Sequence, residues 1–275
     1  MVDMASEVEK LPRILIVAGS DSSGGAGIQA DLKTVTALGG YGMTAITAIT
    51  AQNTLGVHDI HAVPVQTICA QMQAALFDIG ADAVKTGMLA TREVIEAVAE
   101  TLARHAGAVP CVVDPVMVAT SGDKLLAETA IGALKSLLVN GAALVTPNAP
   151  EAELLTGKAV EDVNGQRRAA EALLEAGAKA ALVKGGHVDG KVITDVLQTQ
   201  YGEHIFEGPR VDSNQTHGTG CTLASGVSTL VGAGKSLPEA VDEARAYLFG
   251  AIQNAPGFGA GQGPVHHGWK IKQIM

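Results

Sequence analysis

Aromatic side chains are scarce in this sequence: Phe, Trp and Tyr together make up 3% of its 275 residues. A surface on which nucleic-acid bases stack needs several such rings. Excess positive charge is lacking as well, since the formal net charge is −9 at pH 7. Proteins that bind nucleic acids or anionic membranes through charge carry the opposite sign. We therefore expect neither a nucleic-acid partner nor a membrane partner.

Cysteine and long apolar runs are also limited. Cys69, Cys111 and Cys221 lie far apart and form no Cys-x-x-Cys motif, which argues against a disulfide framework. No apolar run approaches the ~18 residues that a membrane span requires. Residues 1–10 are polar and acidic, unlike a signal peptide. We expect a cytoplasmic protein with a disordered leader at 1–10 and a single domain over 11–275.

Short apolar runs alternate with helical patterns along the whole chain. The continuous apolar run at 13–18 is typical of a strand buried on both faces. Such alternation predicts an α/β fold, with a mainly parallel sheet, helices on both faces and a hairpin at one edge. Cys69 and Cys111 fall on apolar positions and are expected in the core. We expect strands at 13–18, 44–50, 57–63, 83–85, 111–114, 143–145, 180–184, 192–197 and 204–206. We expect helices at 28–38, 64–79, 91–104, 124–139, 166–176, 220–233 and 238–253, and a further one starting near 148.

One glycine turn stands out, the run THGTGCTLA at 216–224. Gly218 and Gly220 flank Thr219, and an apolar helix pattern follows Cys221. Glycines allow successive N–H groups to face one point, and the start of a helix favours an anion such as phosphate. A cysteine at that position is expected to have a lowered pKa. The alternative, a helix start of small residues with a buried and inert cysteine, stays open from this triplet alone.

Polar clusters follow several of the predicted strands, at the sheet edge where α/β proteins bind ligands. They lie at 19–27, 52–53, 85–88, 114, 148–151 and 184–187. Together with the turn at 218–221 they indicate one ligand crevice. The Walker phosphate-binding motif is absent, and the strict Gly-x-Gly-x-x-Gly pattern fails at 24–27. A nucleotide, if one binds, is held in another way.

A family resemblance rests on eight motifs in order. They read AGSDSSGGAGIQADLK at 18–33, TAQNTLGV at 50–57, VKTGML at 84–89, VDPVM at 113–117, TPNAPE at 146–151, KGGH at 184–187, THGTGCT at 216–222 and GPVHH at 263–267. In these motifs the chain resembles the hydroxymethylpyrimidine and hydroxymethylpyrimidine-phosphate kinases of thiamine biosynthesis, over about residues 13–267. That resemblance implies the three-layer fold of the ribokinase-like superfamily.

The resemblance also implies an activity that uses ATP and Mg²⁺. The hydroxymethyl group of 4-amino-5-hydroxymethyl-2-methylpyrimidine is phosphorylated first, and the monophosphate is then converted to the diphosphate. By resemblance Cys221 is the general base of the first step. The N–H groups of Gly218, Thr219 and Gly220 hold the transferring phosphoryl group, where charge accumulates.

The pyrimidine is expected to lie against residues near the start of the chain. Gln52 offers both an acceptor and donors for a ring nitrogen beside an amine. Gly19 would let the ring approach the backbone, and Met88 would pack on its face. Asp31 lies close to the pyrimidine by resemblance. Met88 as a plain core residue, and Asp31 as a carboxylate near a helix start, remain equal alternatives.

The nucleotide and metal are expected at the other group of motifs. By resemblance Asp114, Asn148 and Glu151 hold Mg²⁺ through waters, and Lys184, Asp114 and Thr219 contact ATP. From spacing alone, Asn148 and Glu151 fit a helix capping box equally well. Lys184 also fits a lysine with a buried stem and a solvated tip. The loop 119–124 is our candidate for a lid, and the family suggests a homodimer.

Two other functions compete with this interpretation. A pyridoxal kinase uses the same scaffold and phosphorylates a hydroxymethyl group on a similar ring, and some relatives do both. A non-catalytic pyrimidine-binding protein belongs to another class, and the intact turn at 218–221 with Asp114 and Glu151 argues against it.

Overall fold

The structure is a computed structural model that describes residues 11–119, 121–188 and 190–271. The leader expected at 1–10 lies outside the described residues. Among the described residues, each helix is too short or too polar to cross a membrane.

A nine-stranded sheet runs through the molecule in the order β3-β2-β1-β4-β5-β6-β7-β8-β9. The six strands from β2 to β7 in this order are parallel to one another, while β3, β8 and β9 are antiparallel to their neighbours. The hairpin expected at one edge is therefore confirmed as β8–β9. The strands are β1 Arg13–Asp21, β2 Tyr41–Asn53, β3 Gly56–Ala62, β4 Ala83–Thr86, β5 Cys111–Val113, β6 Leu144–Val145, β7 Ala180–Val183, β8 Val192–Thr199 and β9 Gly202–Pro209.

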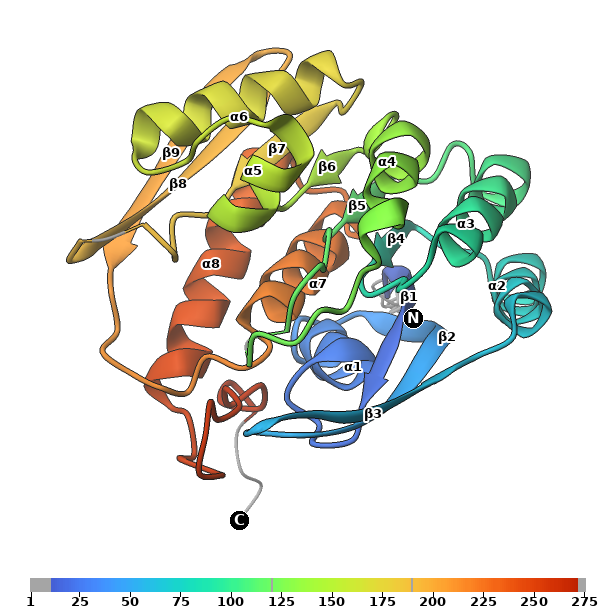
Figure 1. Cartoon of the computed structure of the whole chain (residues 1–275), viewed down its shortest axis with the longest axis horizontal. Coiled ribbons are helices and arrows are strands. Elements are labelled where there is room, and N and C mark those ends of the chain that lie inside the picture. Colours follow the sequence, from blue (N-terminus) through green and yellow to red (C-terminus); the bar gives the residue numbers. More distant parts are fainter. Residues whose placement is uncertain (1–10, 120, 189, 272–275) are drawn as a thin grey trace, which may run out of the picture.

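Helices cover both faces of the sheet, as Figure 1 shows. One face carries α1 Gly27–Ala37, α7 Thr219–Gly232 and α8 Leu237–Gln253. The other carries α2 Val65–Asp78, α3 Arg92–His105, α4 Ile131–Ala133, α5 Ala149–Thr156 and α6 Val163–Glu175. Buried Val, Ile, Leu and Ala side chains fill the two layers between helices and sheet. The predicted three-layer α/β fold is confirmed.

Strand β2 is longer than its apolar pattern predicts. It continues to Asn53 and turns back as β3, so that Gln52 lies within a two-stranded hairpin rather than after a strand. The pairing of β2 with β1 ends at Asp21, opposite Thr50. The end of β2 and most of β3 project beyond the core and are mostly exposed. Periodicity of burial cannot reveal such an extension, because little of it is buried.

The helix expected at 124–139 starts later and is irregular. Residues 124–127 are not helical, because the N–H groups of Leu125 and Leu126 bond to the carbonyl oxygen of Met117. A 3₁₀ turn η1 (Glu128–Ala130) then leads into α4 and into a π-helical segment η2 (Leu134–Val139). The expected start at 124 was wrong, since a hydrogen bond with a preceding loop overrides local propensity.

Candidate active site

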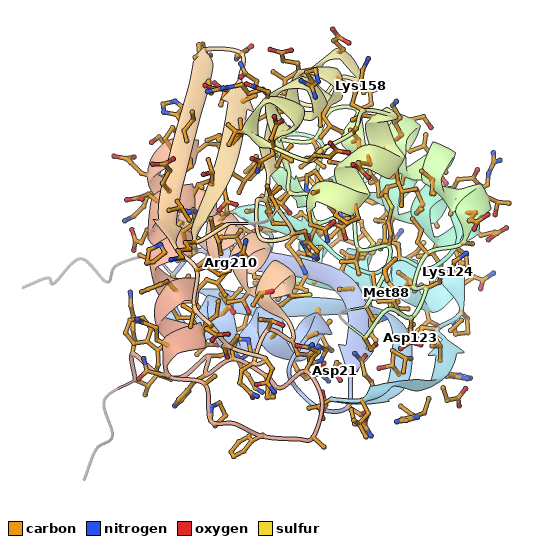
Figure 2. The ribbon with its side chains drawn as sticks, turned by 60° about the vertical axis from the view of Figure 1, so that its left-hand side comes forward. Asp21, Met88, Asp123, Lys124, Lys158 and Arg210 are labelled. Carbon is orange, nitrogen blue, oxygen red and sulfur yellow. The ribbon has the colours of Figure 1, made fainter. Side chains whose placement is uncertain are left out.

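A cavity of about 1120 Å³ opens at the carboxyl ends of the parallel strands. Its lining runs from the ends of β1 and β2 to α8 and the β8–β9 hairpin. In Figure 2, Arg210 marks the end near β8 and β9, while Met88 and Asp21 lie toward the β1 end. Cys221 and Gln52 both line this cavity, so the sequence motifs meet as expected.

The glycine turn forms the start of α7 in the middle of the cavity. Gly218 caps the helix at φ +81°, a left-handed conformation that favours glycine. The hydroxyl of Thr219 donates to the carbonyl oxygen of Thr216 at 3.0 Å and fixes the turn. A methyl group on Gly220 would lie 3.5 Å from Lys184 Nζ and 3.8 Å from Asp114 Oδ2. The first N–H groups of a helix have no acceptor within it, so this turn presents N–H donors beside a lysine.

The thiol of Cys221 does not have the lowered pKa that the sequence suggested. Burial raises its pKa to about 12, and the nearby carboxylates of Asp31 and Asp114 add to the rise. The ammonium of Lys85 and the backbone N–H of Gly27 act in the opposite direction without outweighing burial. The expected thiolate is therefore wrong for the protein free of ligands, because desolvation exceeds the effect of the helix end.

Asp114 and Lys184 form an ion pair on the floor of the cavity. Lys184 Nζ lies 3.3 Å from Asp114 Oδ1, and the Thr146 hydroxyl donates to the same oxygen at 3.2 Å. Burial alone would lower the pKa of Lys184, but Asp114 and Glu151 raise it above the usual range. The lysine therefore stays positively charged, close to the glycine turn, where a phosphate would lie.

Asn148 and Glu151 form the capping box of α5. The Glu151 N–H donates to Asn148 Oδ1 at 2.9 Å, and the Asn148 N–H donates to Glu151 Oε2 at 2.8 Å. The helix cap that the spacing of Asn148 and Glu151 suggested is thus confirmed. Burial raises the pKa of Glu151 to about 7, Asp114 adds to the rise, and Lys184 opposes it.

These carboxylates fit Mg²⁺ only together with other ligands. The described residues contain no cluster of three His, Cys, Asp or Glu side chains that would enclose a metal. Mg²⁺ in phosphoryl-transfer sites binds to one or two carboxylates, with phosphate and water oxygens completing its shell. Asp114 and Glu151 carry the two carboxylates for such a shell, and Asn148 Oδ1 and Glu151 Oε2 each already accept one hydrogen bond in the cap of α5.

The pyrimidine end of the cavity brings together three of the four predicted residues. Gly19, Gln52 and Met88 all line it, and a methyl group on Gly19 would lie 3.0 Å from Met88 Sδ. The Thr50 hydroxyl donates to Gln52 Oε1 at 3.2 Å and orients the amide. Met88 is 7% exposed, so it belongs to both the core and the cavity wall.

Asp31 lies beneath the cavity rather than in its lining. It is fully buried, both of its oxygens lie 2.9 Å from Lys85 Nζ, and the Ser225 hydroxyl donates to it at 2.6 Å. Its side chain is paired with Lys85 and Ser225 and does not line the cavity, and its proximity to the pyrimidine stays a prediction. The pattern could not show this, because Lys85 lies 54 positions away.

Sequence reasoning missed the apolar half of the cavity and a buried His217–Asp21 contact. Residues from α7 and α8 line the end near Arg210, namely Leu223, Leu248, Phe249 and Ile252. The spacing of these residues predicted two helices, but it did not indicate that either helix also lines a ligand cavity. Asp21 lies within the first motif, but its neighbours along the chain do not indicate that it contacts His217.

The fold and the site together define a ribokinase-like small-molecule kinase, with a glycine turn, a lysine and two carboxylates at one edge of the sheet. The model of the phosphomethylpyrimidine kinase family matches residues 21–266. The chain therefore belongs to the phosphomethylpyrimidine kinase family, named for the second of the two substrates that the sequence motifs suggested.

Individual relatives agree with this assignment. The chain is 49% identical to a hydroxymethylpyrimidine/phosphomethylpyrimidine kinase of Streptomyces coelicolor, over 94% of this chain and 96% of the relative. A solved phosphomethylpyrimidine kinase of Clostridium difficile is similar at 40% identity and TM-score 0.78, covering 88% of this chain and 100% of the other. The pyridoxal kinase of Staphylococcus aureus in complex with AMP-PCP and pyridoxal is similar at 34% identity and TM-score 0.87, covering 96% of each chain.

Proposed function

We propose that this chain phosphorylates 4-amino-5-hydroxymethyl-2-methylpyrimidine with ATP and then phosphorylates the monophosphate to the diphosphate. The observation that carries the proposal is that one cavity is lined by Gln52 on β2, by Cys221 at the start of α7, and by residues of β8, β9 and α8. Since β2 and β8 lie on opposite sides of the strands between them, the cavity can hold a ring, a transferring phosphoryl group and a nucleoside side by side. In-line placement is most of what phosphoryl transfer requires of a protein.

The glycine turn and Lys184 stabilise charge on the transferring group. The start of α7 lies beside Lys184 Nζ, since a methyl group on Gly220 would lie 3.5 Å from that nitrogen. Charge that develops on phosphoryl oxygens is stabilised most by donors that are already in place and shielded from water. Mg²⁺, when bound near Asp114 and Glu151, supplies positive charge that offsets these carboxylates and the phosphate oxygens.

Cys221 serves as the base of the first step under this proposal. Its thiol is protonated in the free protein, since the pKa is raised to about 12. Part of that rise comes from Asp114, and a cation held by Asp114 would offset that negative charge. Lys85 and the N–H of Gly27 remain beside the sulfur and favour the thiolate. The monophosphate needs no such base, because its second pKa is about 6 and its oxygen is already anionic.

Activity on three acceptors tests the proposal. The purified chain should consume ATP with the pyrimidine alcohol and with its monophosphate, each measured separately. Failure with both acceptors would contradict it. If none of the three acceptors led to ATP consumption, the non-catalytic alternative would be favoured. Pyridoxal is the third acceptor, because the likeness to a pyridoxal-bound kinase supports that activity as a secondary one.

A homodimer in the cytoplasm completes the proposed function. Exposed apolar side chains lie on the outer hairpin, namely Ile49, Leu55 and Ile60, and Phe77 is exposed on α2. A second copy of the chain is the partner we expect there. Sedimentation should give twice the chain mass, and a monomer at micromolar concentration would exclude the dimer.

A further inference from the structure

A buried contact joins two segments of the site that are 196 positions apart. His217 Nε2 lies 2.9 Å from Asp21 Oδ2, and the two residues are 4% and 2% exposed. Asp21 ends β1, and His217 directly precedes the cap of α7. Both residues line the cavity, and neither has a role in the steps described above.

The carboxylate of Asp21 organises the loop that leads from β1 into α1. It accepts hydrogen bonds from the N–H groups of Ser23, Gly25 and Ala26 as well as from the Ser23 hydroxyl. Burial alone would raise the pKa of Asp21, but the hydrogen bonds, that of His217 foremost, hold it below the usual value. An ionised carboxylate only accepts hydrogen bonds, so Nε2 of His217 is the donor.

The two glycine segments touch at the point where this hydrogen bond lies. A methyl group on Gly218 would lie 1.8 Å from the carbonyl oxygen of Gly25. One on Gly25 would lie 2.3 Å from Cδ2 of the His217 ring. Only glycine permits such an approach. The loop of Asp21 and the turn of His217 are therefore packed against each other as one unit.

That unit determines what surrounds the thiol of Cys221. The start of α1 lies against the start of α7, since a methyl group on Gly218 would lie 3.2 Å from Cα of Ala26, and the N–H of Gly27 favours the thiolate of Cys221. The loop that begins at Asp21 leads to Gly27, and the turn that contains His217 leads to Cys221. The hydrogen bond from His217 to Asp21 fixes the position of this loop relative to this turn.

We propose that His217 and Asp21 are positioning residues, which hold the start of α1 against the start of α7 so that the Gly27 N–H and the anion-binding turn address the same reacting atoms. The proposal rests on the function proposed above. It assigns neither residue a contact with the proton that is transferred. Its effect is on geometry, and a misplacement of ~1 Å in such a site costs on the order of 100-fold in rate.

Substitution of His217 separates positioning from folding. In His217→Leu, kcat of the first phosphorylation should fall on the order of 100-fold, while KM for ATP changes far less. His217→Gln, whose amide can donate to Asp21, should recover most of that loss. Asp21→Asn should resemble His217→Leu. A cycle of His217→Leu, Asp21→Asn and the double variant should show that the two losses do not add.

His267 provides a matched control. It is also a buried histidine, its Nε2 lies 3.0 Å from Thr222 Oγ1 on the same helix, and it does not line the cavity. His267→Leu should lower the melting temperature and leave kcat per folded molecule unchanged.

Three outcomes decide the matter, all measured on folded protein quantified by circular dichroism. A lowered melting temperature for His217→Leu with unchanged kcat would reduce the pair to a structural contact. Equal losses in His217→Gln and His217→Leu, or additive losses in the cycle, would overturn the positioning role. A wild-type protein that leaves the pyrimidine alcohol unphosphorylated would contradict the proposed function instead, and pyrimidine affinity measured by calorimetry in the same variants would then report on the geometry.

Discussion

Cys221 is the residue on which the proposed chemistry depends most. Cys221→Ala should reduce kcat for the pyrimidine alcohol at least 100-fold, the loss expected when a general base worth about 10²- to 10⁴-fold is removed. The same variant should phosphorylate the monophosphate with a loss of less than about tenfold, because that acceptor is already anionic. Both rates are measured separately at saturating ATP.

Cys111 is the control for this prediction. Its thiol is also buried, which raises its pKa to about 12, but it lies outside the cavity lining. Cys111→Ala should leave both rates unchanged. Equal losses of the two steps in Cys221→Ala would show that the thiol serves the shape of the site rather than proton transfer.

The affinity for Mg²⁺ should depend on pH through Glu151, and the direction follows from its raised pKa of about 7. A carboxyl with this pKa is mostly protonated at pH 6 and mostly ionised at pH 8, and only the ionised form binds Mg²⁺. The apparent affinity for Mg²⁺ should therefore rise about tenfold between these pH values. Activity measured against Mg²⁺ concentration at pH 6, 7 and 8 provides the test.

Glu151→Gln should flatten this dependence. Glutamine keeps a side-chain oxygen that can accept from the Asn148 N–H, so the cap of α5 should survive. The stability contribution of Glu151 has the opposite sign to that of most carboxylates. Since its folded pKa exceeds the usual value of 4.5 for a glutamate, the folded state holds the extra proton between about pH 4.5 and 7, and stability from this group falls as pH rises through that window. A persistent pH dependence of Mg²⁺ affinity in Glu151→Gln would assign the titration to another group.

At the scale of elements, the candidate lid is attached to the outer hairpin through one carboxylate. Asp123 Oδ2 accepts the N–H of Val57 at 3.0 Å and the hydroxyl of Ser121 at 2.6 Å. The adjoining Val118, Ala119 and Gly122 line the cavity. In Figure 2, Asp123 and Lys124 lie at the side of the molecule where the hairpin projects. We expect this contact to hold the loop over the pyrimidine end.

Asp123→Asn should weaken closure of this loop. An amide accepts less strongly than a carboxylate, so KM for the pyrimidine should rise several-fold and ATP hydrolysis without acceptor should increase. Both are measured in steady state, with Lys124→Met as the control, because Lys124 pairs with the exposed Glu128 rather than with the hairpin. Unchanged KM and unchanged hydrolysis in Asp123→Asn would mean that the loop does not close the site.

The same elements show what the sequence could predict. A continuous apolar run identified β1, and short apolar segments identified β4, β5, β6 and β7, because strands buried on both faces leave a pattern independent of their neighbours. Three features could not be predicted. The extension of β2 is mostly exposed and leaves no burial pattern, and the helix begins only at residue 128 because Leu125 and Leu126 bond to Met117. The interior position of Asp31 depends on Lys85, 54 positions away. Cys221 illustrates the limit best. Its place at a helix start was predicted, while its pKa is set by burial and by residues 85, 31 and 114.

At the scale of the whole molecule, a buried ion pair joins the sheet to its helices. Lys85 on β4 and Asp31 on α1 are both fully buried, and Ser225 on α7 donates to Asp31. Burial alone would lower the pKa of Lys85, but Asp31, with Cys221 and Asp114, raises it above its usual range, so the lysine is charged. Charges removed from water tolerate the loss of a partner poorly, although the intact pair itself need not stabilise the fold.

Removing one partner should therefore cost more than removing both. Lys85→Met alone and Asp31→Asn alone should each lower the free energy of unfolding by about 3–5 kcal/mol, which corresponds to a melting temperature lower by roughly 10 °C. The double variant should recover part of that loss, because neither charge is then left unpaired. Urea unfolding of the four proteins measures the cycle. Arg92→Met, at an exposed pair with Glu96, should change stability by less than about 1 kcal/mol. If the loss of unfolding free energy in the double variant equalled the sum of the two single losses, the two side chains would contribute through packing. An unpaired charge on Lys85 beside Cys221 would then carry no structural cost of its own.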